Sequence, residues 1–351
     1  MELLKVDSLQ KALEKLIDKS AGIMPKTETV FVEKALGRIL AEDVTSGENV
    51  PGFRRSTMDG YAVIAKDVTG ASESMPGFLK IIGKVEMGEE PTFALQEGEC
   101  AYVPTGAMLP EGADAVVMEE YCEKFTIDQI AVYQSVAEGT HVVEPDEDIS
   151  CGQKILSRGR KIRPQDMGLL ASVGRTTVKV YKPWTCYIIS TGDELTPPDA
   201  PQEKGKVRDV NTYGLMGMAA SYGFEIKGFE RIQDEENALE DAAGRGKAIA
   251  DVVIVSGGSS KGQKDATAKV LDKVSSSGVF THGIAVKPGK PTILAVDGPS
   301  KSILVGLPGH PVAALIVFRQ MVAALWNHKV GTEEELFSIA GKLFCPVMLP
   351  D

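Results

Sequence analysis

The sequence predicts a multidomain protein that combines a small β-domain with an α/β domain whose sheet is mostly parallel. Two stretches of the chain of 351 residues indicate this. Residues 48–149 hold short β-like runs separated by Gly and Pro, with no convincing amphipathic helix between them. From residue 183 onward, apolar strands alternate with helical patterns, which is typical of a parallel sheet with crossover helices. A chain of this length is expected to hold roughly two or three domains.

The chain opens with a predicted helix. Leu9, Leu13 and Leu16 recur at helical spacing, and Asp7 with Gln10 resembles a capping box at the helix start. The charges that alternate with these leucines do not fit a secretory signal. We therefore expect a folded helix here rather than a targeting segment.

Composition and charge argue against several classes of function. The hydrophobic fraction of 43% and the charged fraction of 25% are typical of a soluble globular protein. The net charge of −11 argues against a general affinity for nucleic acid or an acidic membrane. The longest apolar stretch, PVAALIVFRQMVAALW, contains Arg319 and Gln320 and is short for a membrane span, so a buried or interface helix is expected. The five cysteines are scattered without a CxxC pair, which favours a reducing cytoplasm and disfavours disulfides and zinc.

The β-domain is expected to be built from short β-like runs. The runs are GYAVIA (60–65), FLKIIGKV (78–85), CAYVP (100–104), DAVVMEE (114–120) and IAVYQSV (130–136). Two charged segments flank them: VPGFRRSTMDGYAV (50–63) forms a turn, and EPDEDISCG (144–152) taken alone is most simply a solvated acidic turn.

The α/β domain is expected to alternate strands and helices. The strands are TCYIIS (185–190), FEIKGFE (224–230), DVVIVS (251–256), TILAV (292–296) and SILVGL (302–307). Helical patterns follow Asn211, Asp234, Lys264 and Pro311.

Three loops follow strands of this domain directly, and in open parallel sheets ligands bind beyond the carboxyl ends of the strands. They are STGDEL (190–195), SGGSSKGQKD (256–265) and GLPGHP (306–311), while KPGKP (287–291) precedes a strand. Glycine-rich backbone and helix N-termini both suit an anion. The loop at 256–265 is not a Walker A, because Gln263-Lys264 stands where Gly-Lys-Ser/Thr should follow.

The charges around these loops predict a phosphorylated ligand with a metal ion. Lys287 and Lys290 supply ammonium groups suited to phosphate. Carboxylates nearby would repel a phosphate unless a divalent cation, most plausibly Mg²⁺, lies between them. These carboxylates are Asp193, Glu194, Asp234 and Asp265. Each signal alone has a simpler interpretation as a turn or a helix start, so the prediction depends on their combination in one domain.

Seven motifs follow one another along the chain: STMDGYAV, PTGAMLPEGADAVVMEE, DEDIS, STGDEL, SGGSSKGQKD, KPGKP and GLPGHP. In this order they resemble the molybdopterin molybdenumtransferases, a family that includes bacterial MoeA and the E domain of gephyrin. The resemblance implies a segmented linking domain (1–47 and 150–182), an inserted β-domain (48–149) and a MogA-like α/β domain that binds molybdopterin (183–330). Residues 331–351 would then be the start of a C-terminal β-domain that is largely missing.

The resemblance also implies a reaction. Enzymes of this family act on adenylylated molybdopterin, take molybdate as co-substrate, require Mg²⁺ and release AMP. It implies a cytoplasmic homodimer with its active site between subunits, and makes the molybdopterin adenylyltransferase a candidate partner. No nucleic acid or membrane partner is expected.

Site residues carry over by position in the motifs. The implied catalytic residues are Asp59 of STMDGY, Asp148 of DEDIS, Glu194 of STGDEL and Asp265 of GQKD. Asp234 of RIQDEE joins Asp265 as the implied metal ligands. The implied substrate-binding residues are Thr191, Gly192, Ser256, Gly257, Gly258, Lys287, Lys290, Pro308, Gly309 and His310.

Three positions depart from the family pattern. Val143 lies where many members carry a basic residue, Gly283 lies where some carry a lysine, and His310 replaces an amide side chain. The first two bear on how the anionic molybdate is held. Two other functions stay open: adenylyl transfer from ATP to molybdopterin, and a pterin-binding scaffold that has lost catalysis. The sequence does not distinguish molybdate from tungstate.

Overall fold

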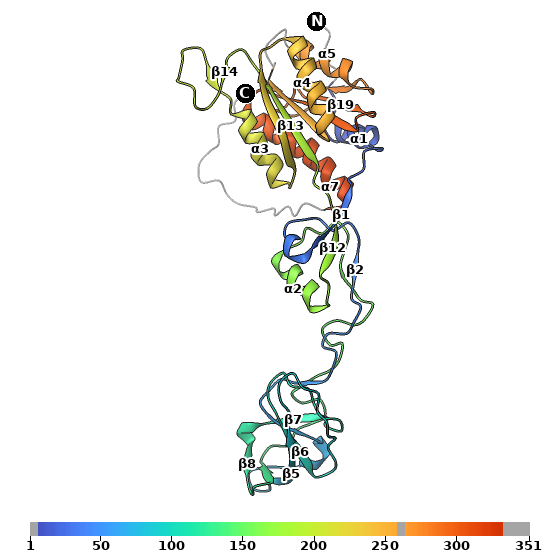
Figure 1. The fold of residues 1–351 in the computed structure, drawn as a ribbon, viewed down its shortest axis with the longest axis vertical. Coiled ribbons are helices and arrows are strands. Elements are labelled where there is room, and N and C mark those ends of the chain that lie inside the picture. Colours follow the sequence, from blue (N-terminus) through green and yellow to red (C-terminus); the bar gives the residue numbers. More distant parts are fainter. Residues whose placement is uncertain (1–5, 258–263, 333–351) are drawn as a thin grey trace. The chain divides into compact units, whose positions relative to one another are not determined.

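The computed structural model describes residues 6–257 and 264–332, with the backbone alone at Lys264 and Asp265 (Figure 1). The chain forms two compact units. The first, which we call the α/β unit, comprises Met1–Glu42, Ser157–Met167 and Thr177–Asp351. The second, the β unit, comprises Asp43–Leu156 and Gly168–Thr176. The boundaries expected for four separate domains stay predictions.

The α/β unit is built around a sheet of six strands in the order β16-β13-β17-β20-β19-β18. The strands are β13 (Thr185–Thr191), β16 (Glu225–Ile232), β17 (Val252–Gly257), β18 (Val279–His282), β19 (Ile293–Asp297) and β20 (Ser302–Leu307). β16, β13, β17 and β20 are parallel neighbours, whereas β19 runs antiparallel to both β20 and β18. The sheet is therefore mixed, with β19 alone reversed, and all five strands expected from the sequence are present in it.

Helices cover both faces of this sheet (Figure 1). They are α1 (Leu9–Lys19), α3 (Asn211–Ser221), α4 (Glu236–Ile249), α5 (Lys264–Val274), α6 (Pro311–Val317), the π-helical segment η4 (Phe318–Ala323) and α7 (Ala324–Val330). Leu16, Leu215 and Phe318 pack in the core on one face, whereas Leu239 and Leu271 pack on the other. The apolar stretch at 311–326 is thus a buried helical run, and no helix of the described residues is long and apolar enough to cross a membrane.

The start of α1 differs from the sequence-based expectation. The N-cap is Ser8, whose Oγ accepts a hydrogen bond of 3.2 Å from the backbone N–H of Lys11. Gln10 donates instead to Glu14, and Asp7 is buried with its carboxylate turned toward Lys15. The expected capping box on Asp7 and Gln10 is therefore wrong, because serine at the next position supplies the capping oxygen.

The β unit contains a second sheet of six strands in the order β7-β4-β6-β5-β9-β8. The strands are β4 (Gly60–Val63), β5 (Gly77–Lys84), β6 (Glu99–Val103), β7 (Ala115–Met118), β8 (Cys122–Lys124) and β9 (Gln129–Val132). All five expected β-like runs contribute strands. Between residues 43 and 156 the helical elements are the short 3-10 turns η2 (Ala65–Val68) and η3 (Glu119–Tyr121).

Four short strand pairs lie outside the two large sheets of the described chain. Three are antiparallel (β1 with β12, β2 with β11, β3 with β10), and β14 with β15 is parallel. Their bounds are β1 (Thr27–Phe31), β2 (Val44–Thr45), β3 (Arg55–Ser56), β10 (Val142–Val143), β11 (Lys154–Leu156), β12 (Thr177–Tyr181), β14 (Leu195–Thr196) and β15 (Val207–Arg208). The remaining elements are η1 (Val32–Lys34) and α2 (Pro164–Ser172).

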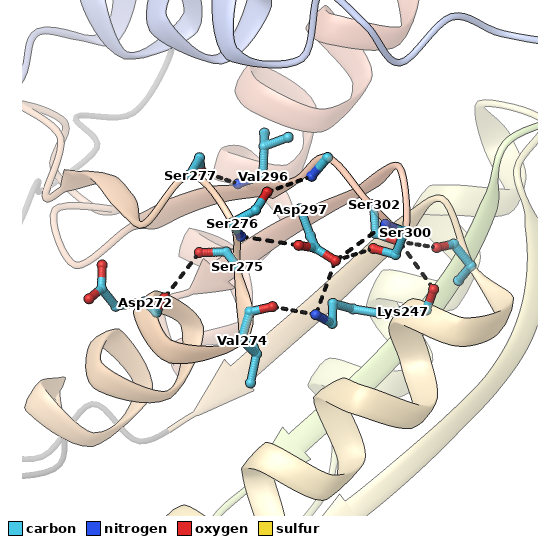
Figure 2. Close-up of polar contacts among 12 residues, drawn as sticks. Lys247, Asp272, Val274, Ser275, Ser276, Ser277, Val296, Asp297, Ser300 and Ser302 are labelled. Atoms are coloured by element: carbon cyan, nitrogen blue, oxygen red, sulfur yellow. Dashed lines mark hydrogen bonds and ion pairs between the residues drawn. The ribbon is translucent and has the colours of Figure 1, made fainter.

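A polar network holds the amino-terminal edge of the α/β sheet together (Figure 2). Lys247, near the end of α4, donates to the carbonyl of Val274 and to Asp297 Oδ2 at 3.1 Å. Asp297 also accepts from Ser300 Oγ at 2.6 Å and from the N–H of Ser276 at 3.1 Å. One buried carboxylate thereby ties α4, the loop after α5 and the β19–β20 turn, at the edge opposite the loops that follow the parallel strands.

Candidate functional site

A cavity of about 510 Å³ lies beyond the carboxyl ends of the parallel strands of the α/β unit. Thr191 ends β13 and Gly257 ends β17, and both line this cavity. The remaining sequence-predicted residues on its wall are Glu194, Asp234, Ser256 and Gly309. The strand-end loops expected to bind a ligand therefore meet at one site.

The position of Asp234 is fixed by hydrogen bonds from the end of β13. Thr191 Oγ1 donates to Asp234 Oδ1 at 2.5 Å, and the N–H of Asp234 donates to Asp193 Oδ1 at 3.2 Å. Glu194 comes from the same loop, and a Cβ placed on Gly192 would lie only 2.8 Å from Glu194 Oε2. Glu194 and Asp234 therefore reach the cavity from two loops, and a side chain at Gly192 would require the flexible end of Glu194 to move.

Gly257 occupies a position that only glycine fits. Its φ is +123°, and a Cβ there would lie 2.0 Å from the carbonyl oxygen of Thr191. The close approach of the two strand ends brings Gly257 to the wall of the cavity. At Gly257 the cavity wall offers backbone rather than a side chain, which suits an anion that binds peptide N–H groups.

Sequence reasoning missed the polar residues that come just before and at the start of α3. Asn211 Nδ2 donates to Ser256 Oγ at 2.8 Å and to the carbonyl of Gly309 at 2.7 Å, so it ties together the loops after β17 and β20. Asp209 is buried and accepts from the N–H and the hydroxyl of Thr212 at 3.0 and 2.6 Å. Asp209 and Asn211 both line the cavity. The helical pattern expected after Asn211 was the available signal, since polar residues at such starts often face a strand-end site.

Several predicted residues do not line the cavity that the described residues form. These are Gly192, Lys287, Lys290, Pro308 and His310. Both lysines are exposed, Pro308 is buried, and His310 is the exposed N-cap residue of α6, where its carbonyl accepts from Ala314 N–H at 2.9 Å. Gly258 lies outside the described residues, as does the side chain of Asp265 in the first turn of α5.

Asp59 and Asp148 belong to the β unit. Asp59 Oδ1 accepts from the N–H of Thr105 at 2.7 Å, and Asp148 Oδ2 lies 3.8 Å from an exposed Arg55 guanidinium nitrogen. The β3–β10 pair joins the STMDGY turn to the segment before DEDIS, and it sets Val143 opposite Arg55. Many members of the family carry a basic residue at the position of Val143. In this chain, the basic side chain of Arg55 lies on the neighbouring strand, directly opposite that position.

Glu144, next to Val143, is already engaged. Arg54 Nε and Nη2 contact both of its carboxylate oxygens at 2.6–3.1 Å. These hydrogen bonds from Arg54 hold the pKa of Glu144 below its usual value, even though partial burial acts in the opposite direction. Glu144 therefore stays charged and paired with Arg54. Asp148 forms the longer ion pair, with Arg55 at 3.8 Å.

The donor atoms at the cavity fit a Mg²⁺ ion that is shared with a phosphorylated ligand. No group of three or more His, Cys, Asp or Glu in the described parts of the chain could hold a metal by itself. The cavity instead offers the carboxylates of Glu194 and Asp234 beside the hydroxyl of Thr191. Mg²⁺ commonly takes one or two carboxylates and completes its shell with water and phosphate oxygens, so this set suits it.

Comparison with protein families gives two matches. Residues 7–174 match the family described as "MoeA N-terminal region (domain I and II)". Residues 187–328 match the family described as "Probable molybdopterin binding domain". The two matches together span both units.

Relatives and solved structures agree with these matches. A putative molybdopterin biosynthesis protein of Methanocaldococcus jannaschii is 32% identical over 328 residues, which cover 91% of this chain and 79% of the relative. A molybdopterin molybdenumtransferase of Haemophilus influenzae is 33% identical over 318 residues, 91% of this chain and 76% of the relative. A crystal structure of a molybdopterin biosynthesis MoeA protein from Pyrococcus horikoshii has a TM-score of 0.83 and 38% identity, and covers 94% of this chain and 82% of that one.

Proposed function

This chain belongs to the MoeA family of molybdopterin molybdenumtransferases, and we propose that it inserts molybdate into adenylylated molybdopterin and releases AMP. A role in molybdenum cofactor biosynthesis follows from the family. The observation that carries the finer proposal is the cavity at the strand ends, where glycine backbone lies together with the carboxylates of Glu194 and Asp234. Backbone N–H groups can bind a phosphate, and a phosphate that carries a metal ion can use the backbone and the carboxylates together.

Asp234 is the proposed metal ligand in the cavity. Thr191 and Asp193 orient it through the hydrogen bonds described above, so its carboxylate is set before a ligand binds. Asp265, from the sequence motif, would be the second ligand, and Glu194 lies in the same cavity. Mg²⁺, when bound, neutralises charge on the phosphoanhydride. The residues of the chain hold and orient the phosphate groups for cleavage.

The phosphate is bound by backbone and by two lysines in this proposal. The loops at Gly257 and Gly309 offer peptide N–H groups, and Asn211 keeps these loops at a fixed separation. Lys287 and Lys290 supply ammonium groups for the negative charge that grows on the phosphate oxygens as AMP leaves. Their exposure leaves them accessible to a ligand.

Asp59 and Asp148 act at the molybdate end of the reaction in this proposal. Oxo groups must accept protons as they leave molybdate, and carboxylates are suitable proton carriers. Arg55, 3.8 Å from Asp148, offers positive charge for the anionic oxo groups. A homodimer, as the family resemblance implies, is part of the proposal.

The test is AMP release from adenylylated molybdopterin in the presence of Mg²⁺ and molybdate, with Asp234→Asn as the variant. The substitution removes one charge from the metal site and keeps the shape, so we expect the rate to fall about a hundredfold and the Mg²⁺ requirement to rise. Asp241→Asn, on the exposed face of α4, is the matched control and should leave the rate unchanged.

Three outcomes contradict the proposal. If the Asp234→Asn variant keeps full activity at low Mg²⁺, Asp234 is not a metal ligand. Formation of adenylylated molybdopterin from ATP favours the adenylyltransferase. Tight product binding without turnover favours a scaffold.

A further inference from the structure

The segment that precedes α1 runs beside the loop that carries Lys287 and Lys290. The N–H of Asp7 donates to the carbonyl of Gly283 at 3.1 Å, and the N–H of Ala285 donates to the carbonyl of Asp7 at 2.8 Å. These two bonds form an isolated parallel bridge between Asp7 and Ile284. The backbone of Asp7 therefore fixes the first residues of the lysine-bearing loop.

The side chain of Asp7 fixes the same place from a second direction. It is only 8% exposed and accepts from Lys15 Nζ at 2.5 Å and from Thr281 Oγ1 at 3.1 Å. Lys15 in turn donates to the carbonyl of Phe280 at 3.2 Å. One buried carboxylate thus joins the segment before α1, α1 itself and β18, which leads into the loop.

The loop is closed at its base by its own backbone. The N–H of Gly283 donates to the carbonyl of Thr292 at 2.7 Å, and the N–H of Ile284 donates to the carbonyl of Lys290 at 3.0 Å. The tip packs on α6, because a Cβ on Gly289 would lie 2.8 Å from Val317 Cγ2. Gly283 and Gly289 have φ of +108° and +132°, a backbone conformation that favours glycine at both positions.

The two lysines themselves have no second anchor. Both side chains are exposed, and neither ammonium group has a hydrogen bond or ion pair among the residues that the structure describes. Their places are therefore set by the loop backbone alone. Anything that shifts the base of the loop shifts both charges.

We propose that Asp7 is a positioning residue for the reaction: its carboxylate fixes the base of loop 283–292 and thereby the places of Lys287 and Lys290. This inference rests on the proposed function, in which both lysines stabilise charge on the phosphate. A displacement of about 1 Å at a reacting group can lower the rate about a hundredfold. The contacts of Asp7, which lie outside the cavity, can therefore affect the rate through the positions of the two lysines.

The test is a double-mutant cycle in the full chain that combines Asp7→Asn with Lys290→Ala. Asp7→Asn keeps the shape but weakens the bonds from Lys15 and Thr281. We expect it to lower the kcat for AMP release about tenfold. The same substitution in the Lys290→Ala background should lower kcat much less, because the group that Asp7 positions is already absent. Asp18→Asn, an exposed carboxylate of α1, is the matched control and should have no effect in either background.

Two outcomes overturn the inference while the proposed function stands. In the first, the Asp7→Asn variant has the kcat of the parent chain. In the second, Asp7→Asn lowers kcat by the same factor in the Lys290→Ala background as in the parent chain. If Lys287→Ala and Lys290→Ala both leave AMP release unchanged, the role of the lysines fails and the inference fails with it. Should Asp7→Asn not fold, Thr281→Val removes one donor of the same clamp, and its cycle with Lys290→Ala decides the question in the same way.

Discussion

Gly257 is the residue where backbone conformation and ligand chemistry meet. At φ of +123°, with the Thr191 carbonyl 2.0 Å from where a Cβ would be, the chain can turn out of β17 only as glycine. Gly257 ends β17 and lines the cavity, so backbone without a side chain faces the cavity where strand hydrogen bonding stops. Glycine is required at position 257 by the backbone geometry, and not because a side chain there contacts the ligand.

Gly257→Ala should therefore destabilise the protein by about 2–4 kcal/mol, since both backbone strain and overlap with Thr191 oppose the added methyl group. Gly217→Ala is the control. Gly217 is exposed in α3 with nothing within 4 Å of an added Cβ, so alanine there should stabilise by about 0.5 kcal/mol. Urea unfolding of both variants measures the difference, and equal stabilities would show that the close approach to Thr191 is not as described.

The residues missed by sequence reasoning share one physical property: their partners are far away in the chain. Asn211 meets Ser256 and Gly309, which are 45 and 98 positions distant, and Asp7 meets Thr281 across 274 positions. Local patterns carry no information about such contacts. Motif residues such as Thr191 could be predicted because strand-end loops of a parallel sheet converge whatever their separation.

At the scale of elements, periodicity predicted five of the six strands of the α/β sheet and missed the edge strand β18. Each strand and helix expected from the sequence of the α/β unit is present, because apolar runs bounded by glycine or polar residues leave few alternatives. The reversed direction of β19 was not predictable in this way. It follows from the short connection between β19 and β20, which allows a hairpin but no crossover.

The polar network around Asp297 is an element-scale clamp with a defined pH dependence. Burial alone would raise the pKa of Asp297, but hydrogen bonds from Ser300 and Lys247 outweigh it, and the pKa lies below the ordinary value of 3.8. The folded state thus prefers the ionised form more than the unfolded state does. Its contribution to stability is complete above pH 3.8 and is lost as pH falls through the lowered pKa.

Asp297→Asn should lower the free energy of unfolding at pH 7 by about 2 kcal/mol, because a charge-assisted network loses its charge. The deficit should shrink as the pH falls from 3.8 through the lowered pKa, where the folded parent chain protonates the same group. Denaturant titrations at pH 7 and pH 3 measure this. Asp241→Asn, an exposed carboxylate of α4, is a control for general charge effects. A deficit that is constant with pH would contradict the assigned pKa shift.

At the scale of the whole molecule, the candidate residues divide between the two units. Asp59 and Asp148 lie in the β unit, whereas the cavity with Glu194 and Asp234 lies in the α/β unit. Each unit has its own buried core. The proposed reaction needs both sets of carboxylates, one for the phosphate and one for molybdate, so neither unit alone accounts for it.

The most direct test of the central claim is the ratio of AMP released to molybdenum bound by the product, measured with adenylylated molybdopterin and Mg²⁺ with and without molybdate. The account predicts AMP release that depends on molybdate and equals the molybdenum incorporated, mole for mole. AMP release at the same rate without molybdate, or molybdenum incorporation without AMP, would contradict it.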